Sequence, residues 1–245
     1  MTATAARPWQ PVATGAVVAG AGLVAAGGAG LLMPLPMAAA GLGYLGGAAA
    51  ILLHWHRRRF GVANLVTLSR VVGTCWVIGL VVQAVLGRLS AYGLLAIILV
   101  AFGCLVLDGV DGTVARAYGE SSRFGARFDV ETDAALLLAL SVVVPILGLA
   151  GWWVVAIGGM RYAYVVAARI TPRSLRRALR IPLPYHYSGK VVAVIQVVAL
   201  LIALILGLTG VATTLPVLPS VPLAAALTLL CWSFGRDVAW QLRAS

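Results

Sequence analysis

The acidic residues of this chain are concentrated in one short stretch. Six of the seven acidic residues in the 245-residue sequence fall between Asp108 and Asp133. Asp108 and Asp111 are three positions apart, and Asp129 and Asp133 are four apart, so each pair lies on one face of a helix. Two antiparallel helices joined by a short turn would point all four carboxylates at one spot.

Four carboxylates so close together repel one another strongly, and charge is already costly at membrane depth. Divalent cations remove this repulsion, and Mg²⁺ or Mn²⁺ prefers hard oxygen ligands together with substrate phosphates. Gly112 beside Asp111 would let a ligand approach the backbone, and Gly125 would do the same on the facing helix or let the helices pack closely. Arg116, one turn past Gly112, could bind phosphate oxygens.

Two other interpretations of the acidic stretch stay open from the residues alone. The aspartates could pair with nearby arginines and only stabilise the helices. A single intramembrane aspartate could also relay protons.

The composition predicts that these residues are positioned by membrane-spanning helices. Hydrophobic residues make up 62% of the chain and charged residues only 10%, whereas soluble domains are about half apolar and about a quarter charged. We expect the fourth apolar run to continue as helix to about Tyr118, and the fifth to begin as helix near Ser122. The sequence therefore predicts an all-α, polytopic membrane helical bundle of about eight transmembrane helices. The apolar runs of spanning length are 13–33, 35–53, 64–87, 91–107, 134–149, 151–168, 191–208 and 221–235.

The basic residues predict how the chain crosses the membrane. The net charge of +11 could indicate nucleic-acid binding, but the basic residues gather in alternate connections between the spans, and the opposite connections hold only Arg88. By the positive-inside rule the basic side is cytoplasmic, and attraction to anionic membrane lipids is a second effect. The single lysine against seventeen arginines suggests a bacterial source. We therefore predict a multi-pass protein of the bacterial cytoplasmic membrane, with both termini and the acidic site facing the cytoplasm and with no nucleic-acid partner.

The first two apolar runs differ from the others. They are rich in glycine and alanine, and residues 12–53 contain no acidic or basic residue. Such small residues allow close helix packing. We expect residues 1–59 to form an accessory transmembrane hairpin and residues 60–245 to form a six-helix functional core.

The acidic stretch also fits a known motif, D-x2-D-G-x2-A-R-x8-G-x3-D-x3-D. On this motif the six-helix core resembles the CDP-alcohol phosphotransferases, and the resemblance leaves out the N-terminal hairpin. The matching residues are Asp108, Asp111, Gly112, Ala115, Arg116, Gly125, Asp129 and Asp133.

The resemblance implies a specific reaction in phospholipid biosynthesis. Such enzymes displace CMP from a CDP-linked lipid, usually CDP-diacylglycerol, when an alcohol hydroxyl attacks it. The first three aspartates would be the main ligands of a two-metal site for Mg²⁺ or Mn²⁺, and the fourth would add to it. Asp133 would also be the catalytic base that takes the proton of the acceptor. The resemblance further suggests a homodimer.

A second element of the same family is matched where the third apolar run begins. Asn64, Thr67 and Arg70 resemble an N-x2-T-x2-R element that lies near the nucleotide. The alternative is an ordinary helix cap followed by an arginine at the membrane interface.

The acceptor pocket is predicted from a looser pattern. Residues 188–190 resemble a G-K element of the family, and Lys190 with Arg161 could bind the phosphate of the acceptor. This favours glycerol phosphate or inositol phosphate, although serine or another simple alcohol stays open. The alternative for Lys190 is a charge that snorkels to the interface. Many family members carry a basic residue where this chain has Ala134, and Arg127 is a candidate to replace it.

Two other functions are weighed against this transferase. A membrane prenyltransferase also uses aspartate-rich motifs and Mg²⁺, but usually as two blocks in separate halves of the bundle. A transporter would carry its charges along a pathway, with discontinuous helices near the midplane. Here one block at one membrane face contains almost all the acids.

Overall fold

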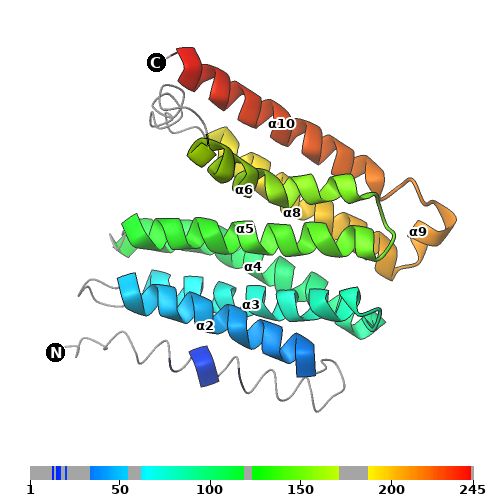
Figure 1. Cartoon of the computed structure of the whole chain (residues 1–245), viewed down its shortest axis with the longest axis horizontal. Coiled ribbons are helices and arrows are strands. Elements are labelled where there is room, and N and C mark those ends of the chain that lie inside the picture. Colours follow the sequence, from blue (N-terminus) through cyan, green and yellow to red (C-terminus); the bar gives the residue numbers. More distant parts are fainter. Residues whose placement is uncertain are drawn as a thin grey trace. The chain divides into compact units, whose positions relative to one another are not determined.

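The computed structural model describes residues 34–54, 62–118, 123–170 and 187–243, with positions 13, 15–17 and 20. Every element within these ranges is helical, which confirms the predicted all-α class (Figure 1). The chain divides into two compact units, residues 1–139 and 140–245, while the division into a hairpin and a core at residue 59 stays a prediction. The elements are α2 (Pro34–His54), α3 (Val62–Val85), α4 (Ala91–Tyr118), α5 (Arg123–Ile146), η1 (Trp152–Val154), α6 (Val155–Ile170), α8 (Tyr187–Leu208), α9 (Val211–Thr214) and α10 (Ser220–Arg243).

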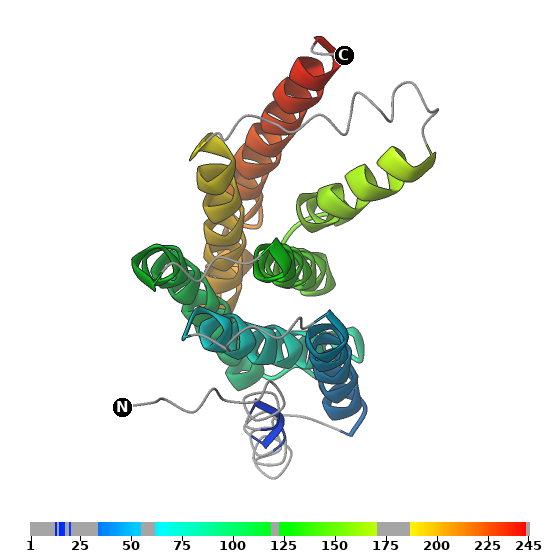
Figure 2. The same cartoon turned by 90° about the vertical axis from the view of Figure 1, so that its left-hand side faces the viewer.

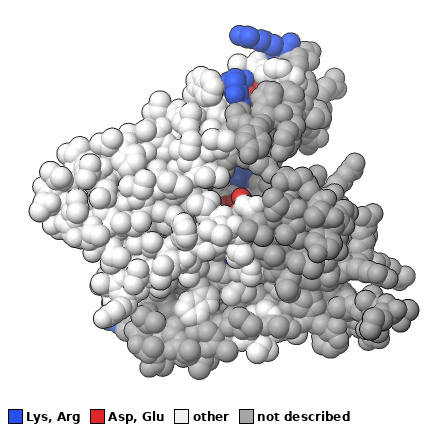
Figure 3. All heavy atoms as spheres, turned by 180° about the vertical axis from the view of Figure 1, so that it is seen from behind, with Lys and Arg blue, Asp and Glu red and all other residues white. Residues whose placement is uncertain are grey.

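Four helices of the described residues are long and apolar enough to cross a membrane. These spans are Leu68–Val85 in α3, Ala91–Gly109 in α4, Val191–Leu208 in α8 and Ser220–Gln241 in α10. Most of the described surface on the face drawn in Figure 3 carries neither acidic nor basic side chains. The chain is therefore a membrane protein. The number of eight spans stays a prediction, and most of the first predicted span, 13–33, lies outside the described residues.

The helices that carry the acidic stretch extend beyond their apolar runs, as predicted. α4 continues to Tyr118, and α5 begins at Arg123. Both helices thus reach past the apolar segments into the polar part of the sequence, where the aspartates lie.

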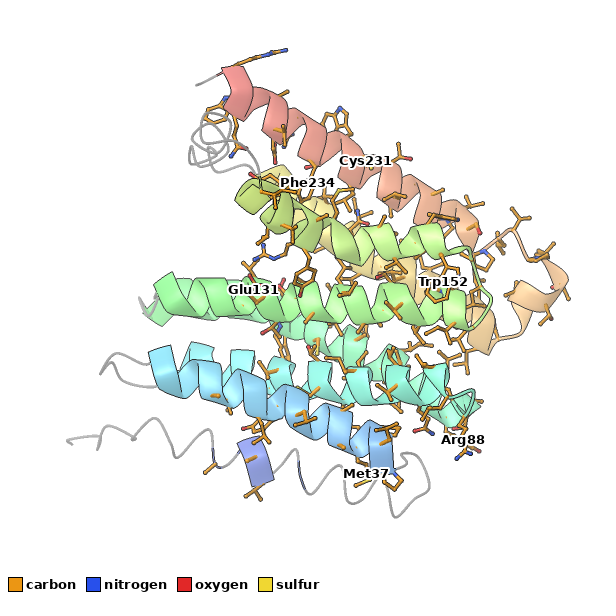
Figure 4. The ribbon with its side chains drawn as sticks, viewed as in Figure 1. Met37, Arg88, Glu131, Trp152, Cys231 and Phe234 are labelled. Carbon is orange, nitrogen blue, oxygen red and sulfur yellow. The ribbon has the colours of Figure 1, made fainter. Side chains whose placement is uncertain are left out.

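A tight turn joins α3 to α4 in the first unit. Gly87 has a φ of 67°, which a residue with a side chain rarely adopts. The N–H groups of Gly87 and Arg88 donate to carbonyls of the last turn of α3, at 2.9 and 3.0 Å, a pattern that ends many helices. The hydroxyl of Ser90 then accepts a hydrogen bond from the first turn of α4, at 3.1 Å. This turn, where Figure 4 shows Arg88, makes α3 and α4 antiparallel neighbours.

Glycine lets α2 and α3 approach each other closely. A Cβ atom placed on Gly79 of α3 would lie 2.9 Å from the carbonyl oxygen of Pro36 and 3.2 Å from the Cβ of Ala40, both in α2. The first of these neighbours is backbone, which cannot move aside cheaply. Small residues at such contacts are how membrane helices pack, because lipid offers no hydrophobic driving force between them.

Gly79→Ala is therefore expected to destabilise the first unit by about 2 kcal/mol, because overpacking outweighs the better helix propensity of alanine. The matched control is Gly41→Ala in α2, where a Cβ would meet no atom within 4 Å. The control should melt at or slightly above the wild-type temperature in detergent. Equal melting temperatures for the two variants would contradict the close contact.

In the second unit, side chains of α6 and α8 make hydrogen bonds and a ring contact to α10. The fully buried Gln196 of α8 donates from Nε2 to the carbonyl oxygen of Ala226 in α10, at 2.9 Å. The hydroxyl of Tyr164 in α6 donates to Oε1 of Gln241, at 3.2 Å, and its ring meets Phe234 edge to face at 5.9 Å. Figure 2 shows α8 and α10 side by side, and Figure 4 shows Phe234 on α10. The span in α8 is the most apolar of the four and that in α10 the least.

Candidate active site

Three aspartate side chains converge in the first unit. Asp108 comes from α4, and Asp129 and Asp133 come from α5. One carboxylate oxygen of each lies within 4.8 Å of the other two. The side chains of Asp108, Asp129 and Asp133 are 40%, 32% and 44% exposed, so the group is open on one side. We call these three residues the carboxylate cluster.

Helical spacing explains why Asp108 points toward the cluster. Ile97, Ala101 and Cys104 of α4 are all buried. They precede Asp108 at helical intervals on the same stripe, so the carboxylate continues the face that α4 turns to the core.

The same reasoning applies to α5. Asp129 and Asp133 lie one turn apart, in line with the buried residues Leu136 and Leu140. Glu131, labelled in Figure 4, lies between the two aspartates in sequence but belongs to an exposed position of the helix. Asp129 and Asp133 therefore lie on the face of α5 that contributes to the cluster, and Glu131 does not.

An arginine from a third helix lies against the carboxylate cluster. Arg70 of α3 is only 2% exposed. Its Nη1 is 3.2 Å from Oδ1 of Asp108 and also pairs with Asp129, while its Nη2 pairs with Asp133. Arg70 thus contacts all three aspartates from the buried side and offsets one of their three negative charges.

The sequence predicts that Arg70 lies near the nucleotide, and the alternative of aspartate–arginine pairs concerns arginines nearby in the sequence, so the ion pairs with Arg70 are a finding of the structure. A signal was present, because Arg70 is the one charged residue in the apolar run 64–87. A charge within a membrane span is almost always paired, and the aspartates were the available partners. The nucleotide role of Arg70 stays a prediction.

The other predicted site residues fall on the expected helices, but the structure does not describe most of their side chains. Arg161 lies on α6 in the second unit and is partly buried. The structure therefore brings together Asp108, Asp129, Asp133 and Arg70, and leaves the remaining assignments as predictions. Positions whose side chains lie outside the described part are Asn64 and Thr67 on α3, Asp111, Gly112, Ala115 and Arg116 on α4, Gly125 and Arg127 on α5, and Lys190 on α8.

The chemistry of the cluster fits a hard divalent cation. All its donor atoms are carboxylate oxygens, which suit Mg²⁺ and Mn²⁺ better than softer metals. The open side of the cluster would leave room for phosphate oxygens and water, which Mg²⁺ usually keeps among its ligands.

Comparisons with known proteins agree with this chemistry. A family model described as CDP-alcohol phosphatidyltransferase matches residues 60–232, a range that contains the carboxylate cluster and Arg70. A probable phosphatidylglycerophosphate synthase of Mycobacterium tuberculosis, from strains CDC 1551 / Oshkosh and ATCC 25618 / H37Rv, is 31% identical over 183 residues. This similarity covers 74% of the present chain and 82% of each relative. No solved structure matches the chain.

Proposed function

Because this chain belongs to the CDP-alcohol phosphatidyltransferase family, we propose that it transfers the phosphatidyl group of CDP-diacylglycerol to a phosphate-bearing alcohol and releases CMP. At the coarser level, the chain is a membrane enzyme of phospholipid biosynthesis that uses a CDP-linked lipid and an alcohol acceptor. The observation that carries the finer proposal is the convergence of Asp108, Asp129 and Asp133 from two helices within the motif of the family.

The carboxylates are proposed to serve as metal ligands. The family uses divalent metal, and we propose that Asp108, Asp111, Asp129 and Asp133 bind two Mg²⁺ or Mn²⁺ ions. When bound, the metal would neutralise the charge that develops on the CMP leaving group. The support is the all-oxygen donor set of the cluster and its open side.

Asp133 is proposed as the catalytic base. The hydroxyl oxygen of the acceptor forms a bond to the phosphorus of the phosphatidyl group, the bond from that phosphorus to CMP breaks, and Asp133 takes the hydroxyl proton. For this it must come within about 3 Å of the acceptor oxygen. Asp133 is the most exposed of the three clustered aspartates, at 44%, which favours its access to the acceptor.

Other residues are proposed to bind the substrates. Around the cluster, the nucleotide and its phosphates would be bound by Asn64, Thr67, Arg70, Gly112, Ala115, Arg116 and Gly125. The phosphate of the acceptor would be bound by Arg161 and Lys190. The name of the mycobacterial relative favours glycerol phosphate over inositol phosphate as that acceptor.

We propose that the site faces the cytoplasm of a bacterium, where CMP and polar acceptors are soluble. The turn that carries Arg88 begins after Val85, about 22 Å along α3 from Arg70. The carboxylate cluster therefore lies far from the α3–α4 turn, whose only basic residue is Arg88. The positive-inside rule predicts this separation for a cytoplasmic site. A homodimer is proposed from the family resemblance alone.

A CMP-release assay tests the proposed reaction. The purified protein is given CDP-diacylglycerol with glycerol 3-phosphate, inositol phosphate, serine or glycerol in turn. We expect CMP release with a phosphate-bearing acceptor, and a loss of about a thousandfold or more when EDTA removes the metal, since bound metal contributes several kcal/mol to such transfers. Added Mg²⁺ or Mn²⁺ should restore the rate. No CMP release with any acceptor, or full release in EDTA, would contradict the proposal.

A further inference from the structure

We propose that the guanidinium of Arg70 competes with divalent metal for the carboxylate cluster and so lowers the affinity of the enzyme for its metal. This inference rests on the metal site proposed above. It assigns to Arg70 a positioning role, through the aspartates, that is distinct from contact with the nucleotide.

Arg70 contacts the three side chains from their buried side, and a metal ion would reach them where they are exposed. Arg70 is 2% exposed and approaches from within the helix packing, whereas the aspartates are between 32% and 44% exposed on the other side. Its two terminal nitrogens contact an Oδ1 atom of each aspartate. A metal ion entering from the open side would bind carboxylates that already accept hydrogen bonds from Arg70.

The guanidinium of Arg70 is suited to contact several carboxylates. Its planar fork can bond several carboxylate oxygens at once. Arg70 therefore opposes metal binding at the carboxylate cluster. With the dielectric constant of bulk water, a unit charge and a divalent ion about 6 Å apart repel by about 1.4 kcal/mol, or about tenfold in affinity.

Arg70 also stabilises the arrangement of α3, α4 and α5. The three carboxylates would repel one another without a cation, and a partner lost from a buried ion pair leaves uncompensated charge. Removing Arg70 is therefore expected to have two opposite effects. The protein without metal becomes less stable, while the affinity for metal rises. Simple structural damage would instead weaken metal binding.

The test is a Mn²⁺ titration of the full-length protein in detergent, in which the EPR signal of free Mn²⁺ is followed. Arg70→Gln keeps hydrogen-bond donors but removes the charge, and Arg88→Gln in the α3–α4 turn is the matched control. We expect the Kd for Mn²⁺ to fall about tenfold in Arg70→Gln and to stay unchanged in Arg88→Gln. The melting temperature in EDTA should fall in Arg70→Gln alone.

Arg70→Lys provides a second variant in case Arg70→Gln does not fold. Lysine keeps the charge but lacks the fork that contacts three carboxylates, so its Kd and its melting temperature in EDTA should lie between those of wild type and Arg70→Gln. An unchanged or weaker affinity for Mn²⁺ in a folded Arg70 variant would overturn the proposed competition while leaving the metal site intact. If the wild-type protein bound no Mn²⁺, the metal site and the competition would both be overturned.

Discussion

Replacement of Asp133 by asparagine is expected to lower the rate of CMP release by about a thousandfold, because a general base typically contributes between a hundredfold and ten-thousandfold. Asparagine has nearly the same shape as aspartate and keeps one oxygen that can face a metal, but its amide cannot take the proton of the acceptor. Metal-dependent binding of CDP-diacylglycerol should therefore be retained. The measurement is CMP release beside equilibrium binding of the lipid in the presence of Mn²⁺.

Glu131→Gln is the matched control for this variant. Glu131 lies on α5 between Asp129 and Asp133 in sequence and is exposed, and it is outside the carboxylate cluster. It also loses one negative charge from the same helix, so the two variants differ mainly in position. We expect Glu131→Gln to release CMP at a rate within a few-fold of wild type. Full turnover by Asp133→Asn would show that another residue is the catalytic base.

Asp108→Ala is expected to lose activity at an earlier step, the binding of the metal. Alanine removes the carboxylate that α4 contributes to the described cluster, so both Mn²⁺ binding and CMP release should be lost. A metal ion stabilises the transition state by several kcal/mol, which corresponds to a loss of about a thousandfold or more. Mn²⁺ binding separates this variant from Asp133→Asn, which should still bind the ion.

The control for Asp108→Ala is Asp237→Asn in the second unit. The carboxylate of Asp237 pairs with Arg236, 3.0 Å away on α10. Its loss should leave both Mn²⁺ affinity and CMP release close to wild type. Mn²⁺ binding by Asp108→Ala with wild-type affinity would exclude Asp108 as a primary ligand.

Much of the site could be predicted because its determinants are local. The spacing of Asp129 and Asp133 fixes a common helical face whatever the rest of the chain does. The extension of α4 to Tyr118 could also be anticipated, because no proline follows the apolar run before Tyr118. The family resemblance, which rested on the acidic stretch, is confirmed by the match over residues 60–232, so the prenyltransferase and transporter hypotheses are set aside.

The part that could not be predicted depends on contacts between distant residues. Arg70 meets Asp129 and Asp133 across 59 and 63 positions of sequence. Local periodicity says which face of a helix is apolar, but it does not say which helix packs against that face. The motif predicts that Arg70 lies near the nucleotide, and the packing of α3 adds that its guanidinium contacts the carboxylates. Only the three-dimensional arrangement shows that Arg70 also balances the charge of the carboxylate cluster.

The hydrogen bond from Gln196 to Ala226 bears on how α10, a helix of low hydropathy, is held in the bilayer. α8 is apolar enough to partition from the translocation channel by itself, while α10 is the least apolar of the four spans and carries Arg236 and Asp237. Such a helix gains from a polar partner on its neighbour, by about 1 kcal/mol. The hydrogen bond from Gln196 therefore favours packing of α10 against α8 within the bilayer.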